Sequence, residues 1–157
     1  MSRSMLGELN QEEIERVLRT QQIGRLGVTD GEQVYVFPVC YGYDGASLYL
    51  VSRTGLKVRL MRIHPEVCLE VELIESPAYW RTVIVHGRFE EVTGVQERDA
   101  ALAVITGQGD ITAPWSIAPY LGGPEEMVVY RIHLREMTGR FERDEIFHSA
   151  QTPRGQA

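Results

Sequence analysis

The residues best suited to binding chemistry lie between Arg53 and Arg62. This ten-residue segment holds four cations and no acid, and one of the cations is Lys57, the only lysine in a 157-residue chain of formal net charge −6. A positive patch beside a serine, a threonine and a glycine could bind a phosphate monoester, because hydroxyls and backbone N–H groups donate directed hydrogen bonds and lysine adds a mobile charge. An amphipathic helix with basic residues on its solvated face explains the same pattern.

Two further features favour a ligand. Trp80 and Arg81 pair a flat aromatic ring with a planar cation, an arrangement that suits a large heteroaromatic ligand. A half-exposed aromatic residue at a barrel rim is the alternative. Pro38 lies inside an apolar strand-like run and cannot donate to a ladder, so that strand is either a plain edge strand or one locally opened toward a ligand.

Other kinds of catalytic site have no support in the sequence. The histidines are scattered at 64, 86, 133 and 148, without metal-ligand spacing, so we predict no metal site. Nucleophile-elbow, P-loop and dinucleotide-binding motifs are absent, and we predict no catalytic side chain. Cys40 and Cys68 are isolated thiols, which we interpret as reduced, half-buried core residues in preference to a disulfide.

The composition predicts one cytoplasmic domain. We place it at residues 1–148, followed by a disordered polar tail at 149–157. The acidic net charge argues against nucleic-acid binding, and no apolar stretch is long enough for a membrane span or a signal peptide.

The hydrophobic pattern predicts three helices and six strands. A helix should follow an Asn10 N-cap and end before Gly24, a second should be capped by Thr54, and a third should run from Thr93 to Ile105. Asp-Gly pairs between alternating runs indicate hairpins. The predicted strands are 25–28, 34–41, 47–52, 67–73, 81–92 and 127–137. We therefore predict a mainly β fold with helices (α+β), a six-stranded antiparallel barrel.

In its order of segments the chain resembles the pyridoxamine 5′-phosphate oxidase-like FMN-binding split barrels, and within them the nitroimidazole-resistance-type branch. The resemblance runs from about residue 9 to residue 141. Its markers are Gln22-Ile23-Gly24-Arg25-Leu26-Gly27-Val28, Val36 to Gly45, Leu48 to Ser52 with Gly55-Leu56-Lys57, His64 to Cys68, Trp80 to Arg88, and Glu136 to Arg140.

The resemblance implies an FMN at the interface of a homodimer. It implies that Lys57 binds the phosphate with Ser52, Thr54 and the Gly55 amide, and that Phe37, Pro38, Val39, Cys40 and Tyr41 follow the isoalloxazine ring. Trp80, Arg81 and Thr82 would reach the flavin from a later strand, and Trp115 could cover it from the partner chain. We also place Val51 among the flavin-binding residues; it stands where many relatives have a histidine, so chemistry attributed to that histidine does not transfer. The C-terminal substrate-binding segment of the oxidases that act on vitamin B6 has no counterpart here.

These features favour an FMN-dependent oxidoreductase of the flavin reductase or nitroreductase kind, which transfers electrons to a small acceptor. One alternative is a protein that binds or stores flavin, deazaflavin or haem without turnover; haem would need His64, His86 or His133 as an axial ligand. The other alternative is a cofactor-free dimer that serves as an interaction domain.

Overall fold

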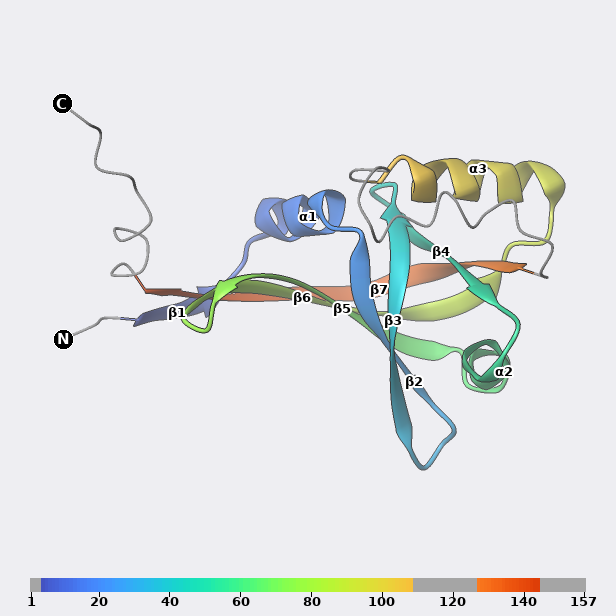
Figure 1. Ribbon diagram of the computed structural model, residues 1–157, viewed down its shortest axis with the longest axis horizontal. Coiled ribbons are helices and arrows are strands. Elements are labelled where there is room, and N and C mark those ends of the chain that lie inside the picture. Colours follow the sequence, from blue (N-terminus) through green and yellow to red (C-terminus); the bar gives the residue numbers. More distant parts are fainter. Residues whose placement is uncertain (1–3, 109–126, 145–157) are drawn as a thin grey trace.

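The computed structural model describes residues 4–108 and 127–144, which form seven strands and three helices (Figure 1). In chain order these are β1 (Ser4–Glu8), α1 (Gln11–Thr20), β2 (Ile23–Thr29), β3 (Val34–Tyr43), β4 (Ser47–Arg53), α2 (Leu56–Ile63), β5 (Glu66–Ser76), β6 (Tyr79–Glu91), α3 (Val95–Thr106) and β7 (Met127–Asp144).

The six strands predicted from the sequence form a closed antiparallel ring. The sheet order is β1-β7-β4-β3-β2-β5-β6, and β6 also pairs with β7, which closes the ring from β7 back to β6. The prediction missed β1, which pairs with the last residues of β7 outside this ring, from Ser4 opposite Asp144 to Glu8 opposite Arg140. It also ended the final strand at Met137, whereas β7 continues to Asp144. Both errors have one cause: this polar stretch is a strand because β1 and β6 pair with it, and its own sequence has no clear alternation.

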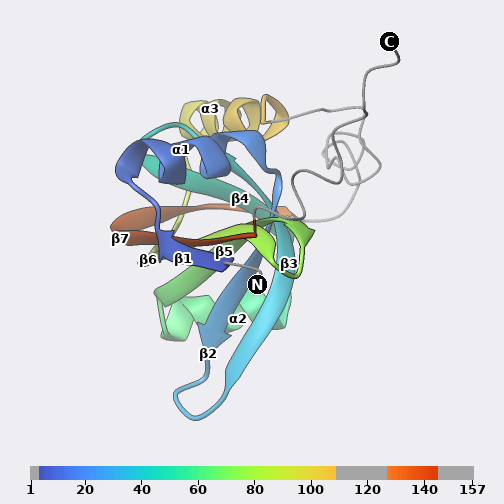
Figure 2. The same ribbon diagram turned by 90° about the vertical axis from the view of Figure 1, so that its left-hand side faces the viewer.

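The barrel interior is filled by side chains that alternate along each strand. Leu48 and Leu50 of β4 and Tyr130 of β7 are completely buried. Figure 2 shows α1 and α3 on one side of the strands and α2 on the opposite side. The apolar stripe of α1, made by Ile14, Val17 and Leu18, is buried as the sequence predicted.

Both predicted Asp-Gly hairpins are present. Gly31 and Gly45 have φ values of 99° and 96°, which an L side chain rarely adopts. The Asp30 carboxylate accepts hydrogen bonds from the Glu32 and Gln33 N–H groups, and Asp44 makes the equivalent bonds at the second turn. Each turn is therefore stabilised by the carboxylate of its aspartate.

Of the three predicted helix starts, one is confirmed and two differ from the structure. Asn10 caps α1 by accepting a hydrogen bond from the Glu13 N–H at 2.9 Å, which confirms that prediction. The predicted Thr54 cap is wrong: Gly55 is the N-cap of α2 and makes no side-chain capping bond. The third helix likewise starts at Val95 after Gly94, two residues later than predicted.

The strand that contains Pro38 is locally opened. β3 pairs with β2 from Val34 to Cys40 but with β4 only from Tyr41 to Tyr43, so its first seven residues have no strand on the β4 side within the described chain. The Tyr41 N–H donates to the Gln22 carbonyl, and ladder alternation then turns the Pro38 nitrogen away from β2. Proline thus occupies a position where no ladder donor is needed.

Two smaller expectations concern the thiols and membranes. Cys40 and Cys68 are half-buried and no disulfide joins them, since β2 lies between their strands. No helix within residues 4–108 and 127–144 is long and apolar enough to cross a membrane. The predicted tail at 149–157 lies outside the described residues.

Candidate functional site

The structure places Lys57 against two other residues of the predicted site. Its Nζ atom donates to the Ser52 Oγ atom at 3.3 Å and lies 5.4 Å from the centre of the Phe37 ring. The ammonium is half-buried, and this burial lowers the pKa of Lys57 from its ordinary value of 10.5. No carboxylate within the described residues forms an ion pair with Lys57, so a partly desolvated cation is held only by a hydroxyl and an aromatic face.

The local chain path explains this cluster. Ser52 lies on the inward face of β4 and is buried, and Lys57 lies in the first turn of α2, after a short bend. Phe37 lies on the inner face of the opened part of β3 and packs against the core. The cluster therefore forms where β4 ends and the barrel wall is split.

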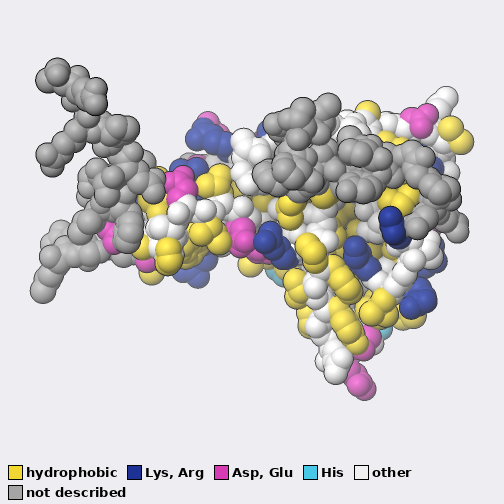
Figure 3. All heavy atoms as spheres, viewed as in Figure 1, with side chains coloured by type: hydrophobic (Ala, Val, Ile, Leu, Met, Phe, Trp, Pro, Cys, Tyr) yellow, Lys and Arg dark blue, Asp and Glu magenta, His cyan; other side chains and the backbone are white. Residues whose placement is uncertain are grey.

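The start of α2 adds positive character to the same place. The first N–H groups of a helix have no intrahelical partner, and here neither a capping side chain nor an acid in the first turn compensates them. Figure 3 shows Lys and Arg side chains on the part of the surface around β4 and α2. Such an arrangement favours a phosphate or another small anion.

The remaining residues near this cluster divide into two groups. Thr54 is exposed and Gly55 half-buried in the bend between β4 and α2, next to Lys57. Val51 points to the opposite face of β4, where it packs against Val92 and Val129 beneath α3. The structure thus separates Val51 from the Lys57 cluster.

The backbone of β3 runs past the cluster. Val39 and Tyr41 have buried side chains, and the Tyr41 hydroxyl donates to the Leu18 carbonyl at 2.7 Å. Pro38 is exposed and Cys40 half-buried on the outer face of this strand. Because the Val39 and Tyr41 side chains are buried, a ligand along the opened edge would meet the main chain at these two positions and not their side chains.

Trp80, Arg81 and Thr82 lie far from Lys57 in the same chain. Thr82 is opposite Arg140 of β7, whereas Ser52 is opposite Val128 of the same strand. At about 3.3 Å per residue, the stretch of β7 between them is about 40 Å long. Figure 1 shows the β5–β6 turn beside β1, at the other end of the molecule from α2.

Polar contacts hold this distant group in place. The Trp80 indole N–H donates to Glu142 at 2.9 Å, and the Thr82 hydroxyl donates to Glu70 at 3.0 Å. Burial raises the pKa of Glu70, with a further contribution from neighbouring Glu72. Trp115, the other aromatic residue predicted at the site, lies outside the described residues.

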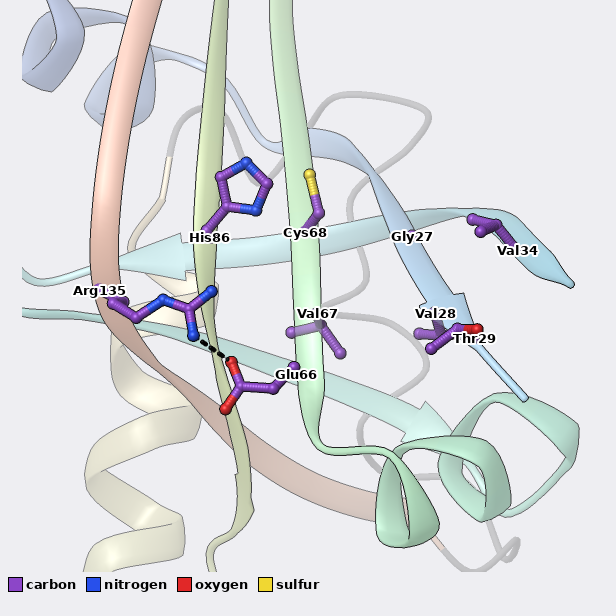
Figure 4. A pocket seen from close by; sticks show the side chains of 9 residues that line it. All are labelled: Gly27, Val28, Thr29, Val34, Glu66, Val67, Cys68, His86 and Arg135. Atoms are coloured by element: carbon purple, nitrogen blue, oxygen red, sulfur yellow. Dashed lines mark hydrogen bonds and ion pairs between the residues drawn. The ribbon is translucent and has the colours of Figure 1, made fainter. Parts of the chain in front are cut away.

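A separate cavity of about 210 Å³ opens on the outer face of the sheet (Figure 4). Cys68 and His86 occupy paired positions of β5 and β6 within its lining, and Glu66 forms an ion pair with Arg135 at 2.8 Å beside them. Burial and the charge of Glu70 raise the pKa of the Cys68 thiol, which makes it a weak nucleophile at neutral pH. No cluster in the described chain has the three ligands that a metal ion needs.

The family of the chain follows from its sequence. The family model described as pyridoxamine 5′-phosphate oxidase matches residues 10–141, which is most of the chain. The chain belongs to the pyridoxamine 5′-phosphate oxidase family. The match begins at the N-cap of α1 and ends within β7, so it includes five strands of the closed ring completely and β7 up to Phe141.

Proteins similar to this chain have been assigned different functions. An uncharacterized protein of Rhizobium meliloti (strain 1021) is 28% identical over 139 residues, covering 84% of this chain and 92% of that protein. The structure of an FAD-binding protein from Mesorhizobium loti is 29% identical with a TM-score of 0.72, and the match covers 89% of this chain and 98% of the other. A proposed 5-nitroimidazole antibiotic resistance protein from Bacteroides thetaiotaomicron has the same TM-score at 20% identity, with 92% of each chain covered, and shows the shared fold.

One residue of the Lys57 cluster was missed in the sequence. The Tyr130 hydroxyl of β7 lies 3.1 Å from the Ser52 Oγ atom in the core of this family member. In the alternation of residues 127–137, Tyr130 falls on the apolar face of the final strand with Val128 and Ile132. A tyrosine on a buried face was nevertheless a signal, because its hydroxyl must find a partner there.

Proposed function

We propose that this chain binds flavin mononucleotide and that the Lys57 cluster holds its phosphate. The observation that carries the proposal is the half-buried Lys57 ammonium, which donates to Ser52 and has no carboxylate partner in the described chain. A phosphate at this position would neutralise the cation and accept from the uncapped start of α2. The Mesorhizobium protein described as FAD-binding supports the flavin class.

The same placement assigns the ring system to the opened strand. From Phe37 to Cys40, the edge of β3 that faces away from β2 has no partner strand within the described residues, and Phe37 lies against Lys57. Thr54 and Gly55 would complete the phosphate site from the bend before α2. Within one chain, this leaves Trp80, Arg81 and Thr82 without access to the same flavin, because of the length of β7 that separates them from Ser52.

A homodimer resolves this separation. If a second copy places its β5–β6 end over the Lys57 cluster of the first, one flavin contacts both groups. The outer face of β3 supports such an assembly, because Val34 and Val36 are 73% and 64% exposed on a face that would normally be polar in water. Figure 3 shows hydrophobic side chains along this projecting β2–β3 hairpin.

The proposed activity is electron transfer from bound flavin to a small-molecule acceptor. The flavin supplies the redox chemistry, whereas the chain binds it, orients it and excludes water. The nearby cations would stabilise negative charge on the ring. Among the described residues of the site, none is placed as a nucleophile or a metal ligand.

The first experiment is a visible spectrum of the purified protein before and after addition of FMN, followed by removal of excess ligand. We expect flavin absorbance at about one flavin per chain. Absorbance of haem, or a colourless protein that binds neither FMN nor FAD, would contradict the proposal. Retention of FAD in preference to FMN would support a flavin as the cofactor but would identify it as FAD and not FMN.

Lys57→Met tests the phosphate contact. Loss of a charge-assisted hydrogen bond worth about 1.5–3 kcal/mol should weaken FMN binding about 10- to 100-fold, measured by fluorescence titration. Arg59→Met is the matched control, since Arg59 is an exposed cation of the same helix. Riboflavin, which lacks the phosphate, should bind both variants as it binds the wild type; equal FMN affinity in Lys57→Met and wild type would exclude the assignment.

Turnover separates an enzyme from a storage protein. The flavin is reduced anaerobically with dithionite, and its reoxidation by quinone and nitroaromatic acceptors is followed at the flavin absorbance. Reoxidation that is faster in the protein than for free FMN supports an oxidoreductase. Slower reoxidation for every acceptor would favour flavin storage.

A further inference from the structure

Tyr130 makes a buried polar contact that the proposed phosphate site does not yet explain. It is completely buried on β7, with its ring 5.3 Å from that of Phe89. Within the described residues, its hydroxyl has a hydrogen bond to one group only, the Ser52 Oγ atom at 3.1 Å. The same Ser52 oxygen accepts from the Lys57 ammonium.

The direction of these hydrogen bonds follows from the groups present. Burial raises the pKa of Tyr130, so the phenol keeps its proton and acts as a donor. A buried hydroxyl proton needs an acceptor, and Ser52 supplies it. Serine has two acceptor lone pairs and one proton. Tyr130 and Lys57 together fill both lone pairs, which leaves the Ser52 proton for a third group.

We propose that Tyr130 is a positioning residue of the phosphate site, acting through Ser52. Its hydroxyl fixes the Ser52 side chain so that Ser52 accepts from Tyr130 and Lys57 and donates to a phosphate oxygen. The inference rests on the proposed function, because it assumes that the ligand of Lys57 is a phosphate.

This arrangement defines the chemistry of the ligand. Ser52 and Lys57 present only donors toward the ligand, so the site favours a group that only accepts, such as a phosphate monoester. The terminal hydroxyl of riboflavin gains much less there. The ratio of FMN to riboflavin affinity therefore reports on the state of Ser52.

Tyr130→Phe tests the inference, with Tyr43→Phe as its matched control. Tyr43 is also buried, and its hydroxyl donates to Glu15 at 3.1 Å, away from the Lys57 cluster. We expect Tyr130→Phe to lower the FMN to riboflavin affinity ratio about five- to tenfold, as for one lost hydrogen bond. Tyr43→Phe should leave the ratio unchanged.

A double-mutant cycle shows whether Tyr130 acts through Ser52. In a Ser52→Ala background, Tyr130→Phe should have no further effect on the ratio. An equal effect in both backgrounds would overturn the relay through Ser52. A ratio unchanged by Tyr130→Phe would overturn the inference while leaving the phosphate site intact, whereas a wild-type protein that binds both flavins equally would overturn the proposed phosphate site as well.

The lysine itself gives a readout that needs no flavin. Because Lys57 is the only lysine, ¹⁵N-lysine labelling gives one side-chain NMR signal from the ammonium. The Lys57 signal should shift in Tyr130→Phe and stay in place in Tyr43→Phe. If Tyr130→Phe does not fold, Ser52→Ala decides: a Lys57 signal identical to that of the wild type would show that Ser52 does not hold the ammonium and would overturn the inference.

Discussion

At the scale of single residues, the chemistry of this protein depends on how its one lysine is surrounded. Lys57 is half-buried, donates to Ser52 and lies over Phe37, so burial disfavours its charge, and no carboxylate within the described residues pairs with it. A phosphate beside it would favour the charged form again. If FMN binds as proposed, its binding and the protonation of Lys57 are linked.

This linkage predicts a pH dependence for the FMN to riboflavin affinity ratio. The Lys57 pKa lies below 10.5 in the free protein and would rise beside a phosphate. Between the Lys57 pKa of the free protein and the higher Lys57 pKa of the complex, the complex holds more protons than the free protein. The FMN to riboflavin affinity ratio should therefore fall as pH rises through this range. It should also fall below about pH 6, where the phosphate monoester takes up a proton.

The measurement is fluorescence titration of both flavins from acid to alkaline pH, with the Lys57 ¹⁵N signal followed in parallel. Using the ratio removes any titration of the flavin ring that the two ligands share. An alkaline midpoint that coincides with the NMR titration of Lys57 in the free protein confirms the link. A ratio that stays flat across the alkaline range would contradict it.

At the scale of elements, the site depends on where strands stop pairing. Only the last three residues of β3 pair with β4, and β4 ends at Arg53, shortly before α2 begins. On the other side of this region, α3 packs closely on β3. A Cβ atom added at Gly42 would lie 2.7 Å from the backbone of Ile105, which is too close for real contacts.

Gly42→Ala should therefore displace α3. We expect a loss of about 1–3 kcal/mol in the free energy of unfolding, measured by urea denaturation, because backbone atoms of α3 must move. Gly27→Ala is the matched control on β2, since its added Cβ would meet the Cys68 carbonyl oxygen at an ordinary 3.5 Å. Equal stability of the two variants would show that α3 can shift without cost.

At the scale of the whole molecule, the long sheet separates two groups of predicted flavin contacts. The Lys57 cluster lies at the α2 end, and Trp80, Arg81 and Thr82 lie at the β5–β6 turn. We propose that one flavin contacts both groups when two chains associate. The exposed apolar side chains on the outer face of β3 favour that face as part of the interface.

Val36→Glu tests this assembly. We expect the wild type to be a dimer at micromolar concentration in sedimentation, and the variant to dissociate with a Kd raised about 100-fold or more, because a buried unpaired carboxylate costs about 3–5 kcal/mol. Flavin should be lost with the partner chain. Val95→Glu is the matched control, since Val95 is 75% exposed at the start of α3. A wild-type monomer that still binds flavin would exclude the shared site.

The sequence alone determined the positions of the six strands that form the ring, because alternating side chains and Asp-Gly turns act over neighbouring residues. Asn10 as the cap of α1 was also predictable, since a side-chain oxygen near a helix start acts locally. The missing N–H of Pro38 limited its strand to an edge strand or an opened one, and the structure decided for the opened strand. The cluster of basic residues around Lys57 was also evident from the residue types of that segment. In these cases the relevant partners lie within a few residues along the chain.

Only the tertiary structure decided the rest. β1 and the end of β7 are strands because they pair with each other across most of the chain: Ser4 lies opposite Asp144, 140 positions later, and Glu8 lies opposite Arg140, 132 positions later. Tyr130 meets Ser52, and Phe37 meets Lys57, because three strands and a helix converge at the split in the barrel. The distance between Lys57 and Trp80 is likewise a property of the folded sheet. Spacing in the sequence cannot specify such contacts, since they arise from packing between distant segments.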